Sequence, residues 1–387
     1  MPTKWFFQYA LLGEQLRLAE EVILHIENGF FKQIEEKASL NDADEVFSNA
    51  LVFPAFINAH THLGDSVAKE AAWNVTIDEA VGKNGVKFRK LREEASEIPR
   101  AVQAILQDMA RCGVAAFADF REEGTNGVSF LRELIKNHFM KAIILGRPTA
   151  GISDLKSVIS ISDGLGIPTT NHFSDHELKE IRGEVKQSKK LLAVHCAETE
   201  EERQRSLKIY GKNDVVRAIK LLEADILIHM TKATQKDLRL VKEHGARLVF
   251  CPRSNAYFGT GFPPVQEALD MEIPAALGTD NVMVTHPDPL QEARWLALQL
   301  RLRGEKPDPR KILRMITVNP AKMFGLTSGI LEEGKKADIL AIDLNSPRTS
   351  FCDDPTLALL MRATPEDYMF VSNHSNSVFS ANMGKSL

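Results

Sequence analysis

The chain has 387 residues, of which 44% are hydrophobic and 26% charged, and its 48 basic and 52 acidic groups leave a net charge of −4. This composition is that of a folded globular protein, and the near balance of charge excludes general binding to nucleic acid, which needs a one-sided positive surface. Four widely separated cysteines and the lack of an apolar run of about 18 residues predict a cytoplasmic protein without a disulfide framework or a membrane span.

The two ends of the chain share a β-rich pattern. Short apolar runs of strand character lie at 5–12, 21–27, 30–35 and, near the C-terminus, 338–343. Gln8 interrupts the first run, which argues for a strand and against a signal peptide. We therefore expect residues 1–52 and 328–387 to pair into one small, discontinuous, β-sandwich-like domain.

In the middle of the chain, short apolar runs alternate with longer amphipathic stretches. The predicted strands are 52–59, 113–120, 141–146, 191–195, 225–230, 247–251 and 273–277. The predicted helices include 99–111, 129–137, 213–222, 234–244 and 289–302. This alternation favours a parallel sheet with crossover helices. An α/β fold with a (β/α)8 TIM barrel over residues 53–327 fits the span, an open doubly wound sheet is the alternative, and the stretch 158–164 is ambiguous.

A pair of histidines ends the first predicted strand of this middle region, in His60-Thr61-His62. Side chains two residues apart on a strand point to the same face, so both imidazoles are expected to converge on one point. Neutral imidazole is the commonest protein ligand for zinc and similar ions. The pair by itself leaves two interpretations open, a metal site and two histidines of the surface or core.

Three further residues of the same chemistry stand at the ends of predicted strands: His195, His229 and Asp280. The carboxyl ends of barrel strands form the face on which barrel enzymes assemble their active sites. Each residue taken singly is also compatible with local hydrogen bonding in the core. Together with His60 and His62 they favour one shared site.

Five motifs run through the chain in order: His60-Thr61-His62, His195-Cys196-Ala197-Glu198, His229, Cys251-Pro252-Arg253-Ser254-Asn255 and Leu277-Gly278-Thr279-Asp280-Asn281. A further pair lies near the C-terminus, Thr317-Val318-Asn319-Pro320-Ala321-Lys322 and Gly334-Lys335-Lys336-Ala337-Asp338-Ile339. As an ordered set they resemble the amidohydrolase superfamily, in its cytosine deaminase and chlorohydrolase-like branch. The resemblance covers nearly the whole chain and implies a barrel that the terminal β domain flanks.

The resemblance implies a metal site whose ligands are His60, His62, His195 and Asp280. Zinc suits this ligand set, and iron or manganese also fit. Binuclear members of the family bridge two metals through a carboxylated lysine at the end of the fourth strand, where this chain has Arg147, so one divalent ion is expected. The implied nucleophile is hydroxide on the metal, with Asp280 accepting the proton of the water and His229 orienting it.

Glu198 distinguishes between reaction types. In the deaminase-like branch, a glutamate at this place protonates a ring nitrogen of the substrate and passes a proton to the leaving ammonia. The alternative is a charge that stabilises the start of the next helix, an interpretation that fits the neighbouring residues 200–202 well. Candidate substrate contacts, for which ion pairing and turn formation are the alternatives, are Arg121, Arg147, Ser254 and Asn255. Other residues that could line the pocket are Asp65, Glu70 and Trp73.

We therefore expect a metal-dependent hydrolase that deaminates an amino-substituted nitrogen heterocycle, such as a purine, pyrimidine, pterin or nucleoside. A second interpretation keeps the site but hydrolyses a cyclic amide, as imidazolonepropionase-like relatives do. A third is a non-catalytic scaffold of the same fold. The expected partner is the small-molecule substrate, with neither nucleic acid nor membrane, and family habit suggests a homo-oligomer.

Overall fold

The computed structural model describes residues 3–82 and 84–372, and their contacts divide the chain into two compact units. One unit holds the described residues up to Ile57, Met109–Ala115 and those from Asp288 onward. The other holds Asn58–Asp108 and Ala116–Pro287. The expected domain boundaries, after residue 52 and before residue 328, stay a prediction.

The first unit contains a six-stranded sheet with the order β15-β14-β4-β1-β2-β3. Its strands are β1 (Thr3–Leu12), β2 (Arg17–Glu27), β3 (Phe30–Glu35), β4 (Glu45–Pro54), β14 (Ile339–Asp343) and β15 (Tyr368–Ser372). The C-terminal strand β14 pairs antiparallel with β4, while β1 pairs antiparallel with β2 and parallel with β4. The prediction that both ends of the chain form one β structure is confirmed.

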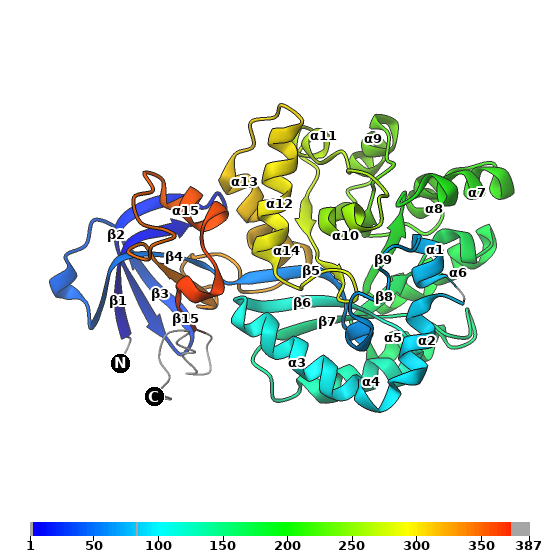
Figure 1. The fold of residues 1–387 in the computed structure, drawn as a ribbon, viewed down its shortest axis with the longest axis horizontal. Helices are drawn as coiled ribbons and strands as arrows, with labels where there is room; N and C mark the ends of the chain where they lie inside the picture. Colours follow the sequence, from blue (N-terminus) through cyan, green and yellow to red (C-terminus); the bar gives the residue numbers. More distant parts are fainter. Residues whose placement is uncertain (1–2, 83, 373–387) are drawn as a thin grey trace. The chain divides into compact units, whose positions relative to one another are not determined.

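A second sheet has the order β12-β11-β10-β9-β8-β7-β6-β5-β13, and Figure 1 follows it from β5 to β9. Its strands are β5 (Phe56–His62), β6 (Val114–Arg121), β7 (Lys141–Gly146), β8 (Gly164–Ile167), β9 (Leu191–Cys196), β10 (Ile226–His229), β11 (Arg247–Phe250), β12 (Ala275–Leu277) and β13 (Asp280–Asn281). Two residues, Gly278 and Thr279, separate β12 from β13. Because β12 pairs with β11 and β13 pairs with β5, both parallel, this interrupted last strand joins the two ends of the sheet. The predicted (β/α)8 barrel is confirmed.

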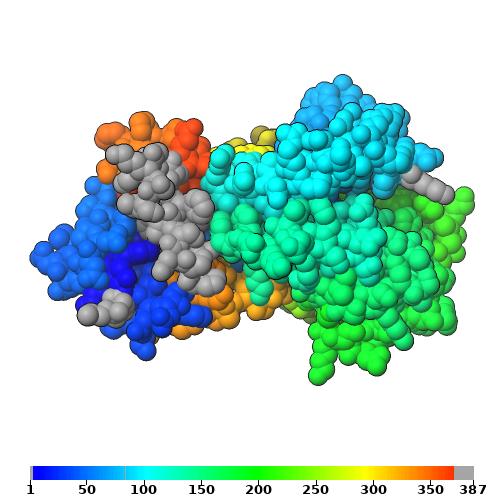
Figure 2. Space-filling view, turned by 90° about the horizontal axis from the view of Figure 1, so that it is seen from below, coloured from blue at the N-terminus to red at the C-terminus, as the bar shows by residue number. Residues whose placement is uncertain are grey.

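Helices follow the barrel strands, as the alternation of patterns predicts. They are α1 (Ile77–Val81), α2 (Val86–Glu93), α3 (Ile98–Arg111), α4 (Gly124–Ile135), α5 (Leu155–Ile161), α6 (Asp175–Ser188), α7 (Glu200–Tyr210), α8 (Asp214–Lys220), α9 (Gln235–Glu243), α10 (Pro252–Tyr257) and α11 (Val265–Asp270). Four more begin after Pro287: α12 (Pro289–Leu302), α13 (Pro309–Arg314), α14 (Val318–Met323) and α15 (Pro355–Met361). The cyan to green atoms of α4 to α6 form one continuous surface in Figure 2. None of the helices among the described residues is long and apolar enough to cross a membrane.

The predicted strand at 52–59 is two strands that belong to different sheets. β4 ends at Pro54 and β5 begins at Phe56, and every residue from Ala50 to His62 is buried. A continuous buried run carries no turn signal between its two strands, so local pattern alone cannot divide it.

The ambiguous stretch at 158–164 ends helix α5 and leads directly into β8. This strand has four residues and two of them are glycines, which gives it little strand character. Both glycines are required by close packing: a Cβ on Gly166 would lie 2.6 Å from Cδ1 of Phe120, and one on Gly164 would lie 2.2 Å from the Leu191 carbonyl oxygen. The sequence predicted seven barrel strands, and β8 is the eighth. Its glycines are explained by close contacts with neighbouring strands and not by any local strand propensity.

Candidate metal centre and active site

Four predicted ligands converge at the carboxyl ends of the barrel strands. His195 Nε2 lies 3.2 Å from His60 Nε2 and 3.3 Å from His62 Nε2. The Asp280 Oδ1 atom lies 3.2 Å from His60 Nε2 and 3.4 Å from His62 Nε2. The structure thus brings together the complete set that the sequence predicts, from strands β5, β9 and β13.

The break in the last barrel strand places Asp280 among these histidines. A Cβ on Gly278 would lie 2.5 Å from the Cβ of His60, so only glycine fits between the two strands. Beside it, the Asn58 side chain donates to Thr279 Oγ1 at 2.7 Å and accepts from the Thr279 backbone N–H at 3.0 Å. These side-chain bonds replace the sheet ladder across the break and set Asp280 opposite Thr61.

The charges of the four groups suit a bound cation. Burial lowers the pKa of His60, and it lowers the pKa values of His62 and His195 well below the ordinary range, so the imidazoles are neutral near pH 7. Burial opposes ionisation of Asp280, but the hydrogen bond to His60 and the nearby histidines lower its pKa well below the ordinary value. Neutral imidazole and ionised carboxylate are the states that ligate metals.

The residues present fit a divalent metal ion. His195 Nδ1 lies 3.2 Å from the Pro168 carbonyl oxygen, so the proton sits on Nδ1 and the Nε2 lone pair faces His60 and His62. Lone pairs of several acceptors directed at one point repel one another unless a cation lies between them. Three nitrogen donors and one carboxylate form a ligand set that zinc accepts.

Glu198 and His229 face each other beside the ligand set. His229 Nε2 lies 3.6 Å from Glu198 Oε1, and His229 Nδ1 lies 3.1 Å from Asn255 Oδ1. Burial raises the pKa of the Glu198 carboxyl above its ordinary value, and His229 offsets the rise in part. A carboxyl group of this kind can hold a proton closer to neutral pH than an exposed glutamate can.

Two residues of the site have a strained backbone. His229 has a φ of 72° and Asp280 a φ of 60°, both in the left-handed region that residues with a Cβ avoid. Such conformations persist only where the surroundings over-determine them, and they cluster at functional sites.

Two of the four residues predicted to contact the substrate, Ser254 and Asn255, are hydrogen-bonded to Asp280 and His229. Ser254 Oγ donates to Asp280 Oδ2 at 2.5 Å, and the Asn255 oxygen faces His229 as described above. The Nδ2 atom of Asn255 is buried and has no hydrogen-bond partner among the described residues. Both side chains come from the first turns of α10, directly after β11.

The two predicted arginines lie in a charged network next to the predicted ligands. Arg147 Nη1 is 3.3 Å from Glu122 Oε1, and its side chain is 31% exposed. Arg121 is buried, with its guanidinium 5.9 Å from the centroid of the Phe130 ring and packed where a Cβ on Gly64 would clash. Arg147 is therefore the more accessible of the two to a ligand.

Sequence reasoning missed the centre of this network, Lys87 on helix α2. Its ammonium group lies 2.8 Å from Asp65 Oδ2 and 2.5 Å from Glu122 Oε1, and the lysine is buried. Asn281 Nδ2 donates to the same Asp65 oxygen at 2.5 Å. Asp65 and Asn281 each follow a predicted metal ligand closely, which is a weak signal in the sequence, whereas nothing near Lys87 marks it as buried.

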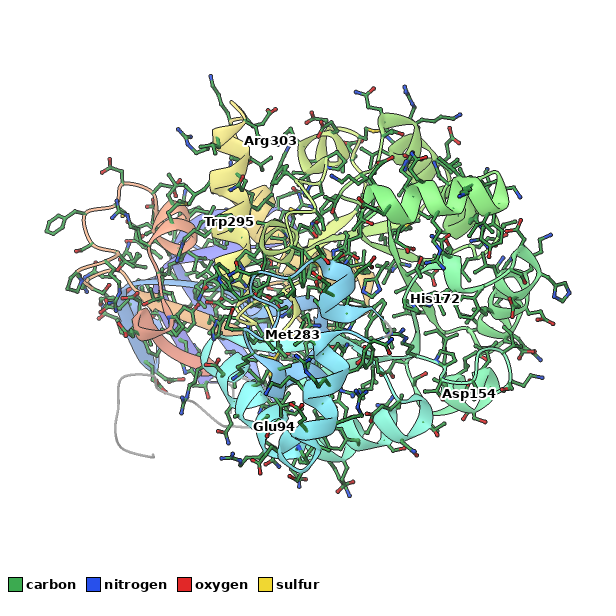
Figure 3. The ribbon with its side chains drawn as sticks, turned by 45° about the vertical axis from the view of Figure 1, so that its right-hand side comes forward. Glu94, Asp154, His172, Met283, Trp295 and Arg303 are labelled. Atoms are coloured by element: carbon green, nitrogen blue, oxygen red, sulfur yellow. The ribbon has the colours of Figure 1, made fainter. Side chains whose placement is uncertain are left out.

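Three loops after β5, β11 and β13 meet at this end of the barrel. The Glu70 backbone N–H donates to the Met283 carbonyl at 2.7 Å, and Figure 3 shows Met283 among the helical turns of the first loop. Trp73 is 65% exposed and its ring meets Tyr257 edge-on, with centroids 5.5 Å apart. Asp65, Glu70 and Trp73, expected to line a pocket, thus all lie in the loop after β5, the strand that carries His60 and His62.

Comparison with known proteins adds a family. The amidohydrolase family model matches residues 51–378. A protein of Methanothermobacter thermautotrophicus is 32% identical over 362 residues, which cover 90% of this chain and 92% of that protein. A 5-methylthioadenosine/S-adenosylhomocysteine deaminase of Pyrococcus furiosus is 27% identical and covers 92% of this chain and 90% of its own length. Among solved structures, an adenosine deaminase from Xanthomonas campestris with bound zinc has a TM-score of 0.85 at 21% identity, covering 96% of this chain and 91% of its own.

Proposed function

The chain belongs to the amidohydrolase family, and we propose that it is a metal-dependent aminohydrolase that removes the amino group from a nitrogen heterocycle. The observation that carries the proposal is the partly buried Glu198 carboxyl, 3.6 Å from His229 and beside three histidines and an aspartate that converge on one point. Relatives that are named deaminases support the same reaction type, and a purine nucleoside is the first substrate class to test.

We propose that His60, His62, His195 and Asp280 hold one divalent ion, with zinc the first candidate. When bound, such an ion lowers the pKa of water toward neutrality and so supplies a nucleophile. Arg147 supports a single ion, because it stands directly after β7 where binuclear relatives of this chain are expected to carry a bridging lysine.

The protein groups divide the proton transfers among themselves. Asp280 accepts a proton from the attacking water, and Ser254 holds its second oxygen in place. The Glu198 carboxyl gives a proton to the ring nitrogen next to the amine-bearing carbon. His229 orients the reacting oxygen through Nε2, because Asn255 engages its Nδ1 atom. A C–O bond forms and the C–N bond breaks. The proton that Asp280 accepted passes to the amino group, which leaves as ammonia, and the remaining hydroxyl proton returns to Glu198 as the carbonyl group of the product forms.

Arg121, Arg147, Ser254 and Asn255 are proposed to contact the substrate. The support is strongest for Asn255, whose buried Nδ2 has a free donor, and for the partly exposed guanidinium of Arg147. A cytoplasmic location and a homo-oligomer remain part of the proposal.

The test is ammonia release from purified protein with a panel that includes 5-methylthioadenosine, S-adenosylhomocysteine, adenosine, guanine and cytosine. At least one compound should release ammonia in step with loss of its amino group, and His62→Ala should abolish the reaction. Turnover of a cyclic amide without ammonia would favour the second interpretation of the sequence. A protein that neither binds a transition metal nor turns over any compound would favour the scaffold.

A further inference from the structure

Glu198 directly follows a strained turn at the end of β9. Ala197 has a φ of 48°, in the left-handed region that is unfavourable for a residue with a Cβ. A turn of this kind keeps its shape only if neighbouring groups hold it. Those groups therefore decide where the Glu198 carboxyl lies.

The Asp214 carboxylate holds this turn from the start of α8. Its Oδ2 accepts the Ala197 backbone N–H at 2.6 Å, and its Oδ1 accepts the Val215 N–H at 3.0 Å. The Cys196 thiol donates to the same carboxylate. Because Asp214 is only 3% exposed, water could not replace these bonds without a change in packing.

A second strained turn, at the end of β10, is hydrogen-bonded to the first. His229 lies in it with a φ of 72°, and the Lys232 backbone N–H donates to the Ala197 carbonyl at 2.7 Å. Displacement of Ala197 would therefore change the distance between Glu198 and His229.

We propose that Asp214 is a positioning residue of the reaction: it fixes the turn at Ala197 and thereby aims the Glu198 carboxyl at the substrate. The proposal rests on the proposed function, in which Glu198 donates the proton. Asp214 acts through the Ala197 backbone and exchanges no proton with the substrate.

The test is a double-mutant cycle of Asp214→Ala and Glu198→Gln, assayed with 5-methylthioadenosine or the panel compound that releases ammonia fastest. Asp214→Ala should lower kcat about 100-fold, the loss expected when a reacting group moves by roughly 1 Å, with KM and metal content little changed. In the Glu198→Gln background the same substitution should lower kcat little further, because the group that Asp214 positions is already inactive. If the role of Asp214 were merely structural, Asp214→Ala would lower kcat by the same factor in both backgrounds.

Asp225→Ala is the matched control, because Asp225 Oδ2 accepts the Leu192 N–H at 2.9 Å at the opposite end of β9. It should lower thermal stability and leave kcat close to that of the wild type. Asp214→Asn keeps the shape and one acceptor oxygen, and it replaces Asp214→Ala if that variant does not fold.

A crystal structure of the Asp214 variant gives a readout that needs no substrate. The Glu198 carboxyl should move away from its place 3.6 Å from His229, and an unmoved carboxyl would overturn the proposal. Full kcat in the variant, or equal losses in both backgrounds, would overturn it as well and leave the deaminase function standing. A wild-type protein that releases no ammonia from any compound would instead overturn the function.

Discussion

Glu198 differs from the acidic residues that follow it in the chain. Thr199 caps helix α7, and Glu200, Glu201 and Glu202 occupy its first turn, where carboxylates favour the positive end of the helix dipole. Glu198 lies before the cap and close to His229, and burial raises its pKa. The interpretation as a helix-end charge thus fits the three residues after Thr199, and the position of Glu198 supports a role in proton transfer.

We predict that Glu198→Gln retains metal and loses about 10²- to 10⁴-fold in kcat, the usual contribution of a general acid or base. Glutamine has the shape of glutamate, but its amide cannot act as an acid near neutral pH. Ammonia release and metal analysis on the same sample check the prediction. Glu201→Gln on the exposed first turn of α7 is the control and should keep wild-type kcat. Full activity of Glu198→Gln would show that the carboxyl takes no part in the chemistry.

At the scale of elements, the interrupted strand β12–β13 is the feature that places Asp280 in the candidate metal centre. Gly278 allows the close approach to His60, and the Asn58 side chain closes the gap in the ladder at Thr279. An uninterrupted strand would continue its hydrogen bonds past this point and would not present Asp280 with a φ of 60°.

Gly278→Ala should destabilise the fold by about 1–3 kcal/mol, the usual cost of overpacking a core, and should weaken metal binding. The added Cβ would lie 2.5 Å from the Cβ and 2.8 Å from the backbone nitrogen of His60, so β5 must shift. Chemical denaturation and a metal titration measure the two effects. The control is Gly183→Ala in helix α6, where a Cβ meets no atom within 4 Å and should stabilise by about 0.5–1 kcal/mol. Unchanged metal affinity in Gly278→Ala would contradict this account of the strand break.

The Lys87 network ties helix α2 to the turn after β5 and to the end of β6. Lys87→Met should cost about 3–5 kcal/mol of unfolding free energy near neutral pH, because it leaves the buried Asp65 and the partly buried Glu122 without their shared cation. Lys90→Met on the same helix is the control, since its contact with Glu93 at 3.6 Å is exposed and should be worth less than about 1 kcal/mol.

The loss of unfolding free energy in Lys87→Met should depend on pH. Burial raises the pKa of Asp65 to about 6 in the wild type, while Lys87 opposes the rise, so the variant should have a still higher value. A carboxyl with a raised folded-state pKa contributes stability that is present below its unfolded pKa and is lost as pH rises through the folded value. The difference in unfolding free energy between Lys87→Met and the wild type should therefore be smaller at about pH 5 than at about pH 8. An equal deficit at both pH values would contradict the assignment to Asp65.

At the scale of the whole molecule, one metal ion is expected to stabilise the folded chain as well as to permit catalysis. Removal by a chelator should abolish ammonia release and lower the melting temperature, because the ligand set converges only in the folded state. Adding zinc to the metal-free protein, at about 100 times its dissociation constant, should raise the free energy of unfolding by about 2.7 kcal/mol. Calorimetric titration should give one equivalent per chain, and His62→Ala should give no rise in melting temperature. Two equivalents at the site would contradict the single-ion proposal.

The sequence by itself was enough to predict the fold class and to name the candidate metal ligands. Alternating apolar and amphipathic stretches are local patterns, so they indicated a β/α barrel without any knowledge of contacts. The candidate ligands could be proposed because each of their motifs stands at a strand end, and parallel strands present their carboxyl ends at one face of the barrel.

Only the tertiary structure decided what depends on contacts between distant residues. It divided the buried run at 52–59 between two sheets, selected the glycine-rich strand β8, and interrupted the last strand at Gly278. It also buried Lys87 between two carboxylates. Strand pairing, backbone strain and charge burial are settled by partners far away in the chain, and no local pattern of residues encodes them.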